Sequence, residues 1–320
     1  MAAPAGATDP MPISDAPAIA DTPVLPLPAL QDATPDYLRL GADMADRMTL
    51  PVEIGEGGPY PFLVDTGSYR SIVATELARR LMLQELPPVE IISMAGHETV
   101  ASVHLDQLRF GNQVISDLPA LSVGHDDLGS AGLIGLDSLR NKRLTLDFRK
   151  RQMMIAKSAP APTTHWASDV IVVQARSKLG QLILVDSRID GKRVNVILDT
   201  GAEMSVGNMA LFNKLKTKRL LIPPRPVTIK SVTGQPIQAQ FTVVRELGIE
   251  SLTLHNVPMV FLDAAPFDEL GLSDKPSMLL GMGMLRMFNR IAIDFGSRHV
   301  DFEVPQSSGT ETSERMLAAL

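Results

Sequence analysis

Short apolar runs separated by glycine-containing turns dominate the chain from about residue 47 onward. In the first half the strand-like runs are Met48–Ile54, Tyr60–Val64, Val89–Met94, Thr99–Leu105, Leu118–Val123, Leu144–Phe148 and Met153–Ala156. Such runs around turn residues are typical of β-hairpins. Only Thr75–Leu83 in this half has helical spacing. The pattern therefore predicts a mainly β structure with short helices.

The chain also repeats itself, because three sequence blocks recur in the same order at offsets of 134, 146 and 147 residues. The paired blocks are Phe62–Ser68 with Val196–Ala202, Leu133–Leu136 with Leu279–Met282, and Leu144–Phe148 with Ile291–Phe295. Repetition of this kind indicates internal duplication. We therefore expect two similar β-rich lobes in one polypeptide.

Changes in composition suggest where the domains begin and end. Residues 1–46 hold eight of the 24 prolines and predict a disordered Pro/Ala-rich leader. The expected lobes are residues 47–156 and 169–304. Residues 157–168 are rich in Pro, Ala and Thr and predict a linker, and residues 305–320 predict a polar tail.

Charge and composition exclude several classes of protein. The net charge of -6 and the aromatic content of 4% argue against a nucleic-acid partner. The chain has no cysteine, and its histidines lack the spacing of metal ligands, so no metal site is expected. No apolar run approaches the roughly 20 residues of a membrane span, and no export signal is visible at the N-terminus.

The residues with the strongest chemical signal are Asp65 and Asp199. Each follows three apolar residues and precedes Thr-Gly, so a buried strand should deliver each carboxylate to a tight turn. The alternative is ordinary turn chemistry, since Asp and Gly are common turn residues. Two copies with matched flanks favour a paired carboxylate site.

These blocks resemble a known family. An apolar run ending in Asp-Thr-Gly-Ser/Ala, a hairpin, an apolar-apolar-Gly block and a short helix together resemble one lobe of a retropepsin-like aspartic protease. The resemblance covers both predicted lobes and excludes the leader and the tail. It implies an all-β fold in which two tandem retropepsin-like lobes form a pseudo-twofold, pepsin-like bilobal structure, as in single-chain bacterial forms.

The resemblance further implies an aspartic endopeptidase acting on extended protein segments. Asp65 and Asp199 would share one proton and activate a water, without a metal or cofactor. The paired threonines would bond across the lobe junction, and the glycines would permit the turns. The supporting residues implied in this way are Thr66, Gly67, Ser68, Thr200, Gly201 and Ala202.

Two hairpin tips are candidate flaps over a bound peptide. By resemblance, Ser93–Glu98 and Ser231–Gln235 would close over a substrate bound as a β-strand. The candidate substrate-binding residues are Met94, Ala95, Gly96, His97, Val232, Thr233 and Gly234. The alternative for either hairpin is plain lobe surface.

One difference between the repeats bears on protonation. Ser68 follows the first Asp-Thr-Gly, whereas Ala202 follows the second. We expect the serine hydroxyl to donate to the carboxylate of Asp65 and to stabilise its ionised form. Asp199 should then hold the proton more readily, and activity should extend to mildly acidic or near-neutral pH.

Other conspicuous residues have structural explanations. Asp147 and Asp294 lie at the ends of repeated strands and are expected in turns or ion pairs. Met282, Met284 and Met287 are expected on a helix whose side chains fill the core.

Three functional alternatives stay open at the sequence level. The first is an active monomeric protease, and the second is a retropepsin-like scaffold that binds peptides without cutting them. The third is a dimer in which each Asp pairs with its counterpart in another chain. The expected partner is a protein or peptide substrate. The resemblance favours the periplasm, and the cytoplasm is the alternative.

Overall fold

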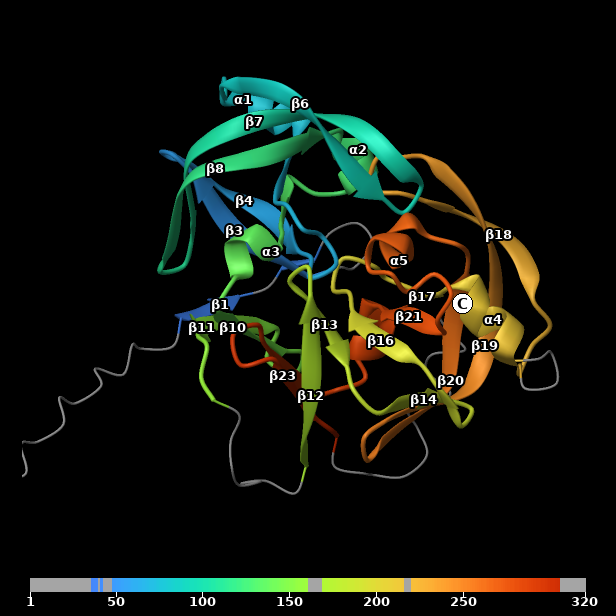
Figure 1. Ribbon diagram of the computed structural model, residues 1–320. Coiled ribbons are helices and arrows are strands. Elements are labelled where there is room, and N and C mark those ends of the chain that lie inside the picture. The colour runs from blue at the N-terminus through green and yellow to red at the C-terminus, as the bar shows by residue number, and fades with distance from the viewer. Residues whose placement is uncertain (1–35, 40, 43–47, 161–168, 216–219, 306–320) are drawn as a thin grey trace, which may run out of the picture. The chain divides into compact units, whose positions relative to one another are not determined.

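The computed structural model describes residues 36–39, 41–42, 48–160, 169–215 and 220–305, which are mainly β-strand (Figure 1). They belong to one compact unit that spans residues 35–320. The predicted all-β class with two tandem lobes is confirmed. In the described residues no helix is long and apolar enough to cross a membrane.

The first lobe is built on an eight-stranded sheet. Its strands are β2 (Gly41–Ala42), β3 (Met48–Ile54), β4 (Gly57–Val64), β5 (Ile72–Ala74), β6 (Glu85–Ser93), β7 (Gly96–Phe110), β8 (Gln113–Val123) and β9 (Gly132–Ile134). Their order in the sheet is β2-β3-β4-β9-β5-β8-β7-β6. Its helices are α1 (Thr75–Arg80), α2 (His125–Leu128) and α3 (Leu136–Leu139). The core includes Phe62, Leu105, Leu108 and Phe110, all fully buried.

The second lobe repeats this plan. Its strands are β13 (Gln181–Leu184), β14 (Ser187–Ile189), β15 (Lys192–Arg193), β16 (Asn195–Leu198), β17 (Ser205–Gly207), β18 (Arg225–Lys230), β19 (Pro236–Ile249), β20 (Leu252–Phe261) and β21 (Ser277–Leu280). Its helices are α4 (Met209–Leu215), α5 (Ala265–Glu269) and α6 (Met282–Leu285). The parallel pairs β16–β21 and β17–β20 match β4–β9 and β5–β8 of the first lobe.

The register of these pairs explains the first two repeated blocks. Val64 lies opposite Ile134 in the first lobe, and Leu198 lies opposite Leu280 in the second. The Asp-Thr-Gly strand and the apolar-apolar-Gly strand of each lobe are therefore neighbours, and both end at the same edge. Because both strands are buried, each reads as a continuous apolar run.

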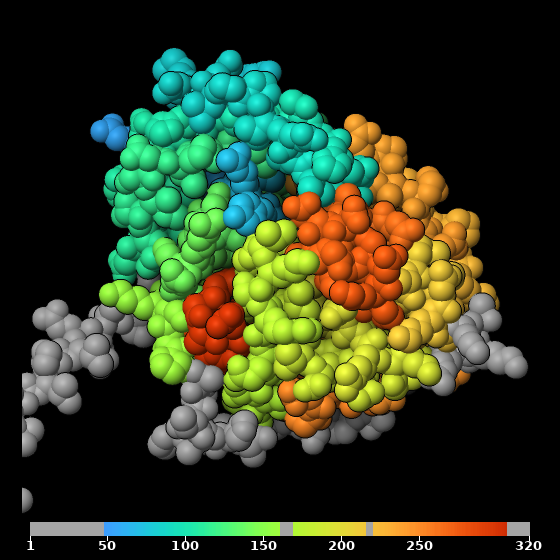
Figure 2. Space-filling view, in the orientation of Figure 1, coloured from blue at the N-terminus to red at the C-terminus, as the bar shows by residue number. Residues whose placement is uncertain are grey.

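The third repeated block joins the lobes. It lies in β10 (Lys142–Asp147) and β22 (Arg290–Asp294), which pair antiparallel with Leu144 opposite Ile293. Around this pair the order is β1 (Asp36–Arg39), β11 (Gln152–Lys157), β10, β22, β23 (His299–Glu303) and β12 (Val170–Lys178). The surfaces of the first lobe (blue to green) and of the second (yellow-green to red) are in contact in Figure 2.

Two predicted segments differ from the structure. The leader predicted for residues 1–46 contains β1, which pairs with β11, and β2, which pairs with β3. Both strands satisfy the backbone groups of a sheet edge, which proline content does not reveal. The rest of that leader, most of the linker and the tail after residue 305 lie outside the described residues.

Two helices are shorter than predicted. α1 ends at Arg80 rather than continuing to Leu83, because Met82 has a left-handed backbone with φ of 51°. α6 ends at Leu285, so Met287 lies beyond it, although Met282 and Met284 are buried in the core as expected.

A buried carboxylate accepts several hydrogen bonds in the sheet that joins the lobes. Asp294 is fully buried and accepts hydrogen bonds from the Ser158 hydroxyl and from the backbone N–H groups of Ala159 and Ser297. Arg143 of β10 lies 3.9 Å from its Oδ2. Burial opposes ionisation, but the hydrogen bonds, led by that of Ser158, outweigh it and hold the pKa of Asp294 below its usual value.

We predict that Asp294→Asn lowers the free energy of unfolding at pH 7 by about 2 kcal/mol, since hydrogen bonds to a charged group are lost. The pKa of Asp294 is lower in the folded than in the unfolded protein. The ionised carboxylate therefore stabilises the folded protein at pH values above the unfolded pKa, and this stabilisation is lost as pH falls through the folded pKa. Urea unfolding at pH 7 and pH 3 should show the deficit shrinking in acid.

The matched control for this variant is Asp147→Asn. Asp147 ends the repeated strand of the first lobe, where its Oδ1 accepts a hydrogen bond from the exposed Lys150 N–H. We expect a loss below ~1 kcal/mol, as for an exposed polar contact. Equal losses in the two variants would contradict the role given to Asp294.

Candidate active site

Two strand ends position the candidate carboxylates. β4 ends at Val64 and β16 at Leu198, one residue before Asp65 and Asp199. The N–H of Asp65 donates to the carbonyl of Ile134, and the N–H of Asp199 donates to that of Leu280. Each aspartate is thus fixed by the neighbouring parallel strand of its own lobe.

The loops after the aspartates have the same hydrogen-bond pattern in both lobes. Oδ1 of Asp65 accepts from the N–H groups of Gly67 at 2.7 Å and Ser68 at 3.1 Å. Oδ1 of Asp199 accepts in the same way from Gly201 at 3.0 Å and Ala202 at 3.1 Å. Each turn therefore supplies two backbone donors to its own carboxylate.

The glycine of each apolar-apolar-Gly block lies directly behind these loops. Gly135 N donates to the Ser71 hydroxyl, and Gly281 N donates to the Ser205 hydroxyl. A Cβ at Gly135 would lie 2.5 Å from a backbone atom of Arg70, and one at Gly281 would lie 2.7 Å from a backbone atom of Met204. Only glycine fits so near the backbone, which explains why both blocks end in this residue.

Thr66 and Thr200 connect the two loops across the lobe junction. Thr66 N donates to Thr200 Oγ1 at 3.0 Å, and Thr200 N donates to Thr66 Oγ1 at 3.2 Å. Their hydroxyls donate in turn to the carbonyl of the opposite strand, Thr66 to Leu198 and Thr200 to Val64. Four buried hydrogen bonds thus hold the loops face to face.

The two carboxylates meet where these loops face each other. A Cβ on Gly67 would lie 2.7 Å from Oδ1 of Asp199, and one on Gly201 would lie 2.2 Å from Oδ2 of Asp65. Each carboxylate therefore lies against the glycine of the opposite lobe. A side-chain hydrogen bond also links the two aspartates. The structure thus brings together eight residues predicted from sequence: Asp65, Thr66, Gly67, Ser68, Asp199, Thr200, Gly201 and Ala202.

Protonation of the pair is asymmetric. Asp199 is only 8% exposed, and burial, followed by the nearby charge of Asp65, raises its pKa to about 8. Two carboxylates in contact cannot both ionise without a large electrostatic cost. The pair therefore retains one proton to higher pH than a lone aspartate would, and the raised pKa falls on Asp199.

The predicted cause of this asymmetry was wrong. The hydroxyl of Ser68 donates to the carbonyl of Arg70 at 2.8 Å and not to Asp65. Ser68 serves Asp65 through its backbone N–H, which Ala202 matches at Asp199. The direction agrees with expectation, but it comes from desolvation and not from a serine hydroxyl.

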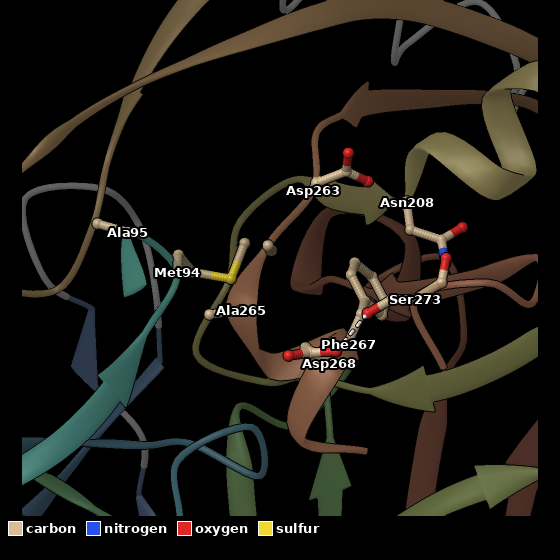
Figure 3. Close-up of a pocket in the computed structure, with 9 residues that line it drawn as sticks. Met94, Ala95, Asn208, Asp263, Ala265, Phe267, Asp268 and Ser273 are labelled. Carbon is tan, nitrogen blue, oxygen red and sulfur yellow. Dashed lines mark hydrogen bonds between the residues drawn. The ribbon is translucent and has the colours of Figure 1, made fainter. Parts of the chain in front are cut away.

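The tip of the first flap candidate lies against the second lobe. β6 and β7 pair up to Ser93 and Gly96, leaving Met94 and Ala95 as the turn. Met94 packs on an apolar cluster of the second lobe that includes Phe267. The Met94 thioether extends toward Ala265 and Phe267 in Figure 3.

A cavity of about 270 Å³ adjoins this tip. Its lining includes Asn208, Asp263, Asp268 and Ser273 of the second lobe, and the Ser273 hydroxyl donates to Asp268 at 3.2 Å (Figure 3). His97, another residue predicted for this flap, bonds the exposed carboxylate of Glu90 on β6 at 3.0 Å.

The second flap candidate lies against the first lobe. Val232 packs on an apolar cluster of that lobe which includes Leu121 and Leu128. A Cβ on Gly234 would lie 2.3 Å from Oδ1 of Asp127, which follows from its close approach to α2. Thr233 stays within its own turn, where its hydroxyl bonds that of Ser231 at 2.7 Å. Each hairpin tip thus docks on the opposite lobe.

A second cavity, of about 370 Å³, lies between the lobes beside the Asp65 loop. The first lobe contributes Gly67–Arg70 and the β6 residues Glu90–Ile92, and the second contributes Gln181, Val232 and Leu270 among others. Gln181 and two α5 residues that also line the cavity, Pro266 and Glu269, were missed from sequence. None of them lies near a repeated block, so no local pattern pointed to them.

In the part of the chain that the structure describes, no cluster of three or more His, Asp or Glu side chains could hold a metal ion.

Comparison with known families agrees with this geometry. Residues 50–141 match the model of the gag-polyprotein aspartyl proteases, and residues 185–284 match the model of a family described as aspartyl protease. The first match contains Asp65 and the second contains Asp199. No curated protein matches the sequence.

Thr200→Val tests the link between the loops. The variant leaves the Val64 carbonyl and the Thr66 N–H unpaired in a buried site, so the free energy of unfolding should fall by about 2–4 kcal/mol. Thr200→Ser keeps the hydroxyl and should lose less than ~1 kcal/mol, mainly for one methyl group. Urea unfolding compares the two, and equal stability would contradict the link.

Asp199→Asn tests the raised pKa. A folded pKa above the unfolded value stabilises the protein below the unfolded pKa, and this stabilisation is lost as pH rises toward about 8. Asparagine cannot titrate. The free energy of unfolding of the variant should therefore exceed that of the wild type by about 1–3 kcal/mol at pH 7–8, and the two should differ little near pH 4. Asp186→Asn, at an exposed position, should leave the pH dependence of unfolding unchanged; a similar gain there would refute the assignment.

Proposed function

Because the chain belongs to the retropepsin-like aspartic protease family, with an aspartyl-protease domain in each lobe, we propose that it is an aspartic endopeptidase whose catalytic residues are Asp65 and Asp199. The observation that carries the proposal is the reciprocal contact of each carboxylate with the glycine of the opposite loop. Two aspartates in turns of unrelated function would have no reason to meet in this way.

The protonation of the pair supports a division of roles. Asp65, with two backbone donors on Oδ1, acts as the general base that takes a proton from a bound water. Asp199, whose pKa is raised by burial and by Asp65, donates a hydrogen bond to the scissile carbonyl. The roles then reverse, and a proton passes to the leaving amine.

The surroundings of the pair support an extended peptide as substrate. The cavity beside the Asp65 loop has walls from both lobes, including the apolar side chains of Ile91, Val232 and Leu270. Hairpin tips from both lobes flank the site, and a substrate bound between them as a strand could use its backbone for affinity and its side chains for selectivity. With each tip docked on the opposite lobe, water would be excluded from a bound substrate and the electrostatic interactions would be stronger.

We further propose that one chain is the active unit. Both halves of the carboxylate pair come from one polypeptide, and the threonine hydrogen bonds that align them are intramolecular. Pairing between two chains is therefore unnecessary for assembly of the site.

Loss of either carboxylate tests the proposal. With a fluorescently labelled, unstructured protein as substrate, Asp65→Asn and Asp199→Asn should each lower kcat by about 10³-fold or more, as expected for residues that act as a unit. Asp147→Asn, at an exposed turn of the first lobe, serves as the control and should retain activity. Wild-type activity should decline as pH rises through about 8, where Asp199 loses its proton.

Mixing the two single variants tests the active unit. An intramolecular pair predicts no recovery of cleavage in the mixture, whereas recovery would indicate that aspartates pair between chains. Substrate binding without any cleavage by the wild type between about pH 3 and 8, the range over which such a pair titrates, would favour the non-catalytic scaffold instead.

A further inference from the structure

A hairpin of the second lobe reaches the Asp65 loop of the first. β12 and β13 pair with Lys178 opposite Gln181, so Leu179 and Gly180 form a two-residue turn with φ of 50° and 84°. A Cβ on Gly180 would lie 3.5 Å from the side chain of Leu136 in α3. The start of β13 is thereby placed directly beside the first lobe.

Gln181 makes a hydrogen bond there that no sequence repeat predicts. Its Nε2 donates to the carbonyl oxygen of Gly67 at 2.8 Å. Because a carbonyl only accepts, this bond determines which end of the amide faces Gly67. Oε1 is buried and has no hydrogen-bond partner among the described residues. The side chain thus gives up one of its polar interactions while it contacts the loop of Asp65.

The bond acts on the peptide group that supports Asp65. The carbonyl of Gly67 and the N–H of Ser68 belong to the same peptide, and that N–H donates to Oδ1 of Asp65 at 3.1 Å. A donor on the carbonyl polarises the peptide and strengthens the hydrogen bond made by its N–H. A continuous chain of hydrogen bonds therefore runs from Gln181 through the Gly67–Ser68 peptide to the carboxylate.

We propose that Gln181 is a positioning residue of the second lobe that holds the Gly67–Ser68 peptide and, through it, supports the ionised carboxylate of Asp65. The inference rests on the proposed function, since it concerns the general base of that reaction. It also gives the second lobe a direct influence on the chemistry of the first, in addition to the threonine pair.

Charged groups near the Asp65 loop do not replace this bond. Asp199 faces Asp65 directly, and Arg70, Glu90 and Glu269 line the adjoining cavity. Gln181 is uncharged, so its effect comes from hydrogen bonding and should depend little on salt. This property separates it from the charged side chains in the cavity wall.

Gln181→Met keeps the length of the side chain and removes the donor. We expect kcat to fall about 3- to 10-fold, the effect of one net hydrogen bond, with KM changed less than about twofold. The acidic limb of the kcat profile should move to higher pH, because Asp65 becomes harder to ionise. Gln174→Met, on the exposed face of β12, is the matched control and should change neither quantity.

The pH dependence of kcat in Gln181→Glu is a second test, because a residue with a purely structural role would not change it. An ionised glutamate repels the Gly67 carbonyl, whereas its protonated form can donate to it. The variant should therefore be impaired near pH 7 and recover toward wild-type kcat as pH falls through the titration of the new carboxyl group. An unchanged acidic limb in Gln181→Met, or a rise in KM alone, would show that Gln181 is only part of the cavity wall.

Carboxyl pKa values measured by 13C NMR on Asp-labelled protein make the test independent of turnover. Gln181→Met should raise the lower pKa of the aspartate pair, and Gln174→Met should leave it unchanged. If the wild type cleaves and neither the pKa nor kcat moves, this inference fails alone. If the wild type does not cleave but the pKa moves, the proposed function fails and the link from Gln181 to Asp65 stands.

Discussion

The reciprocal hydrogen bonding of Thr66 and Thr200 is the constraint on which the site depends. Each threonine uses its hydroxyl twice, as acceptor for the opposite N–H and as donor to the opposite strand. Because all four bonds are buried, breaking one leaves polar groups unpaired where water cannot replace the partner. The lobes therefore have one favourable alignment, and it is the alignment in which the two carboxylates face each other.

This alignment creates an electrostatic problem that the fold resolves by asymmetry. Both aspartates receive two backbone donors, so the turns alone would favour ionisation of both. Burial of Asp199 and its closeness to Asp65 oppose this, and the pKa of Asp199 rises to about 8. A nearly twofold backbone thus holds a pair of carboxylates that differ in pKa, the arrangement that the proposed acid and base roles need.

Local sequence patterns predicted the features that depend on local structure. The apolar runs predicted most strands of the first lobe, and the repeated blocks predicted strands that the structure pairs in parallel within each lobe. The same patterns marked Asp65 and Asp199 because each follows a buried strand. Interactions between distant segments left no local pattern. Examples are the pairing of β1 with β11, the Gln181 bond to Gly67, and the Ser68 hydroxyl, which bonds a nearby carbonyl instead of the carboxylate.

Exchange of contacts between the lobes extends beyond the threonine pair. Met94 packs on the second lobe, Val232 packs on the first, and Gln181 reaches the loop of Asp65. Each lobe therefore supplies its own aspartate but depends on the other for the surroundings of that aspartate. In a fused chain the two copies can diverge at such contacts, because a residue needs to serve only one side. Gln181 is such a residue: the first lobe has arginine at the position that corresponds by the 134-residue offset. Divergence at the lobe junction can thus change the surroundings of one carboxylate without disturbing the backbone symmetry that aligns both.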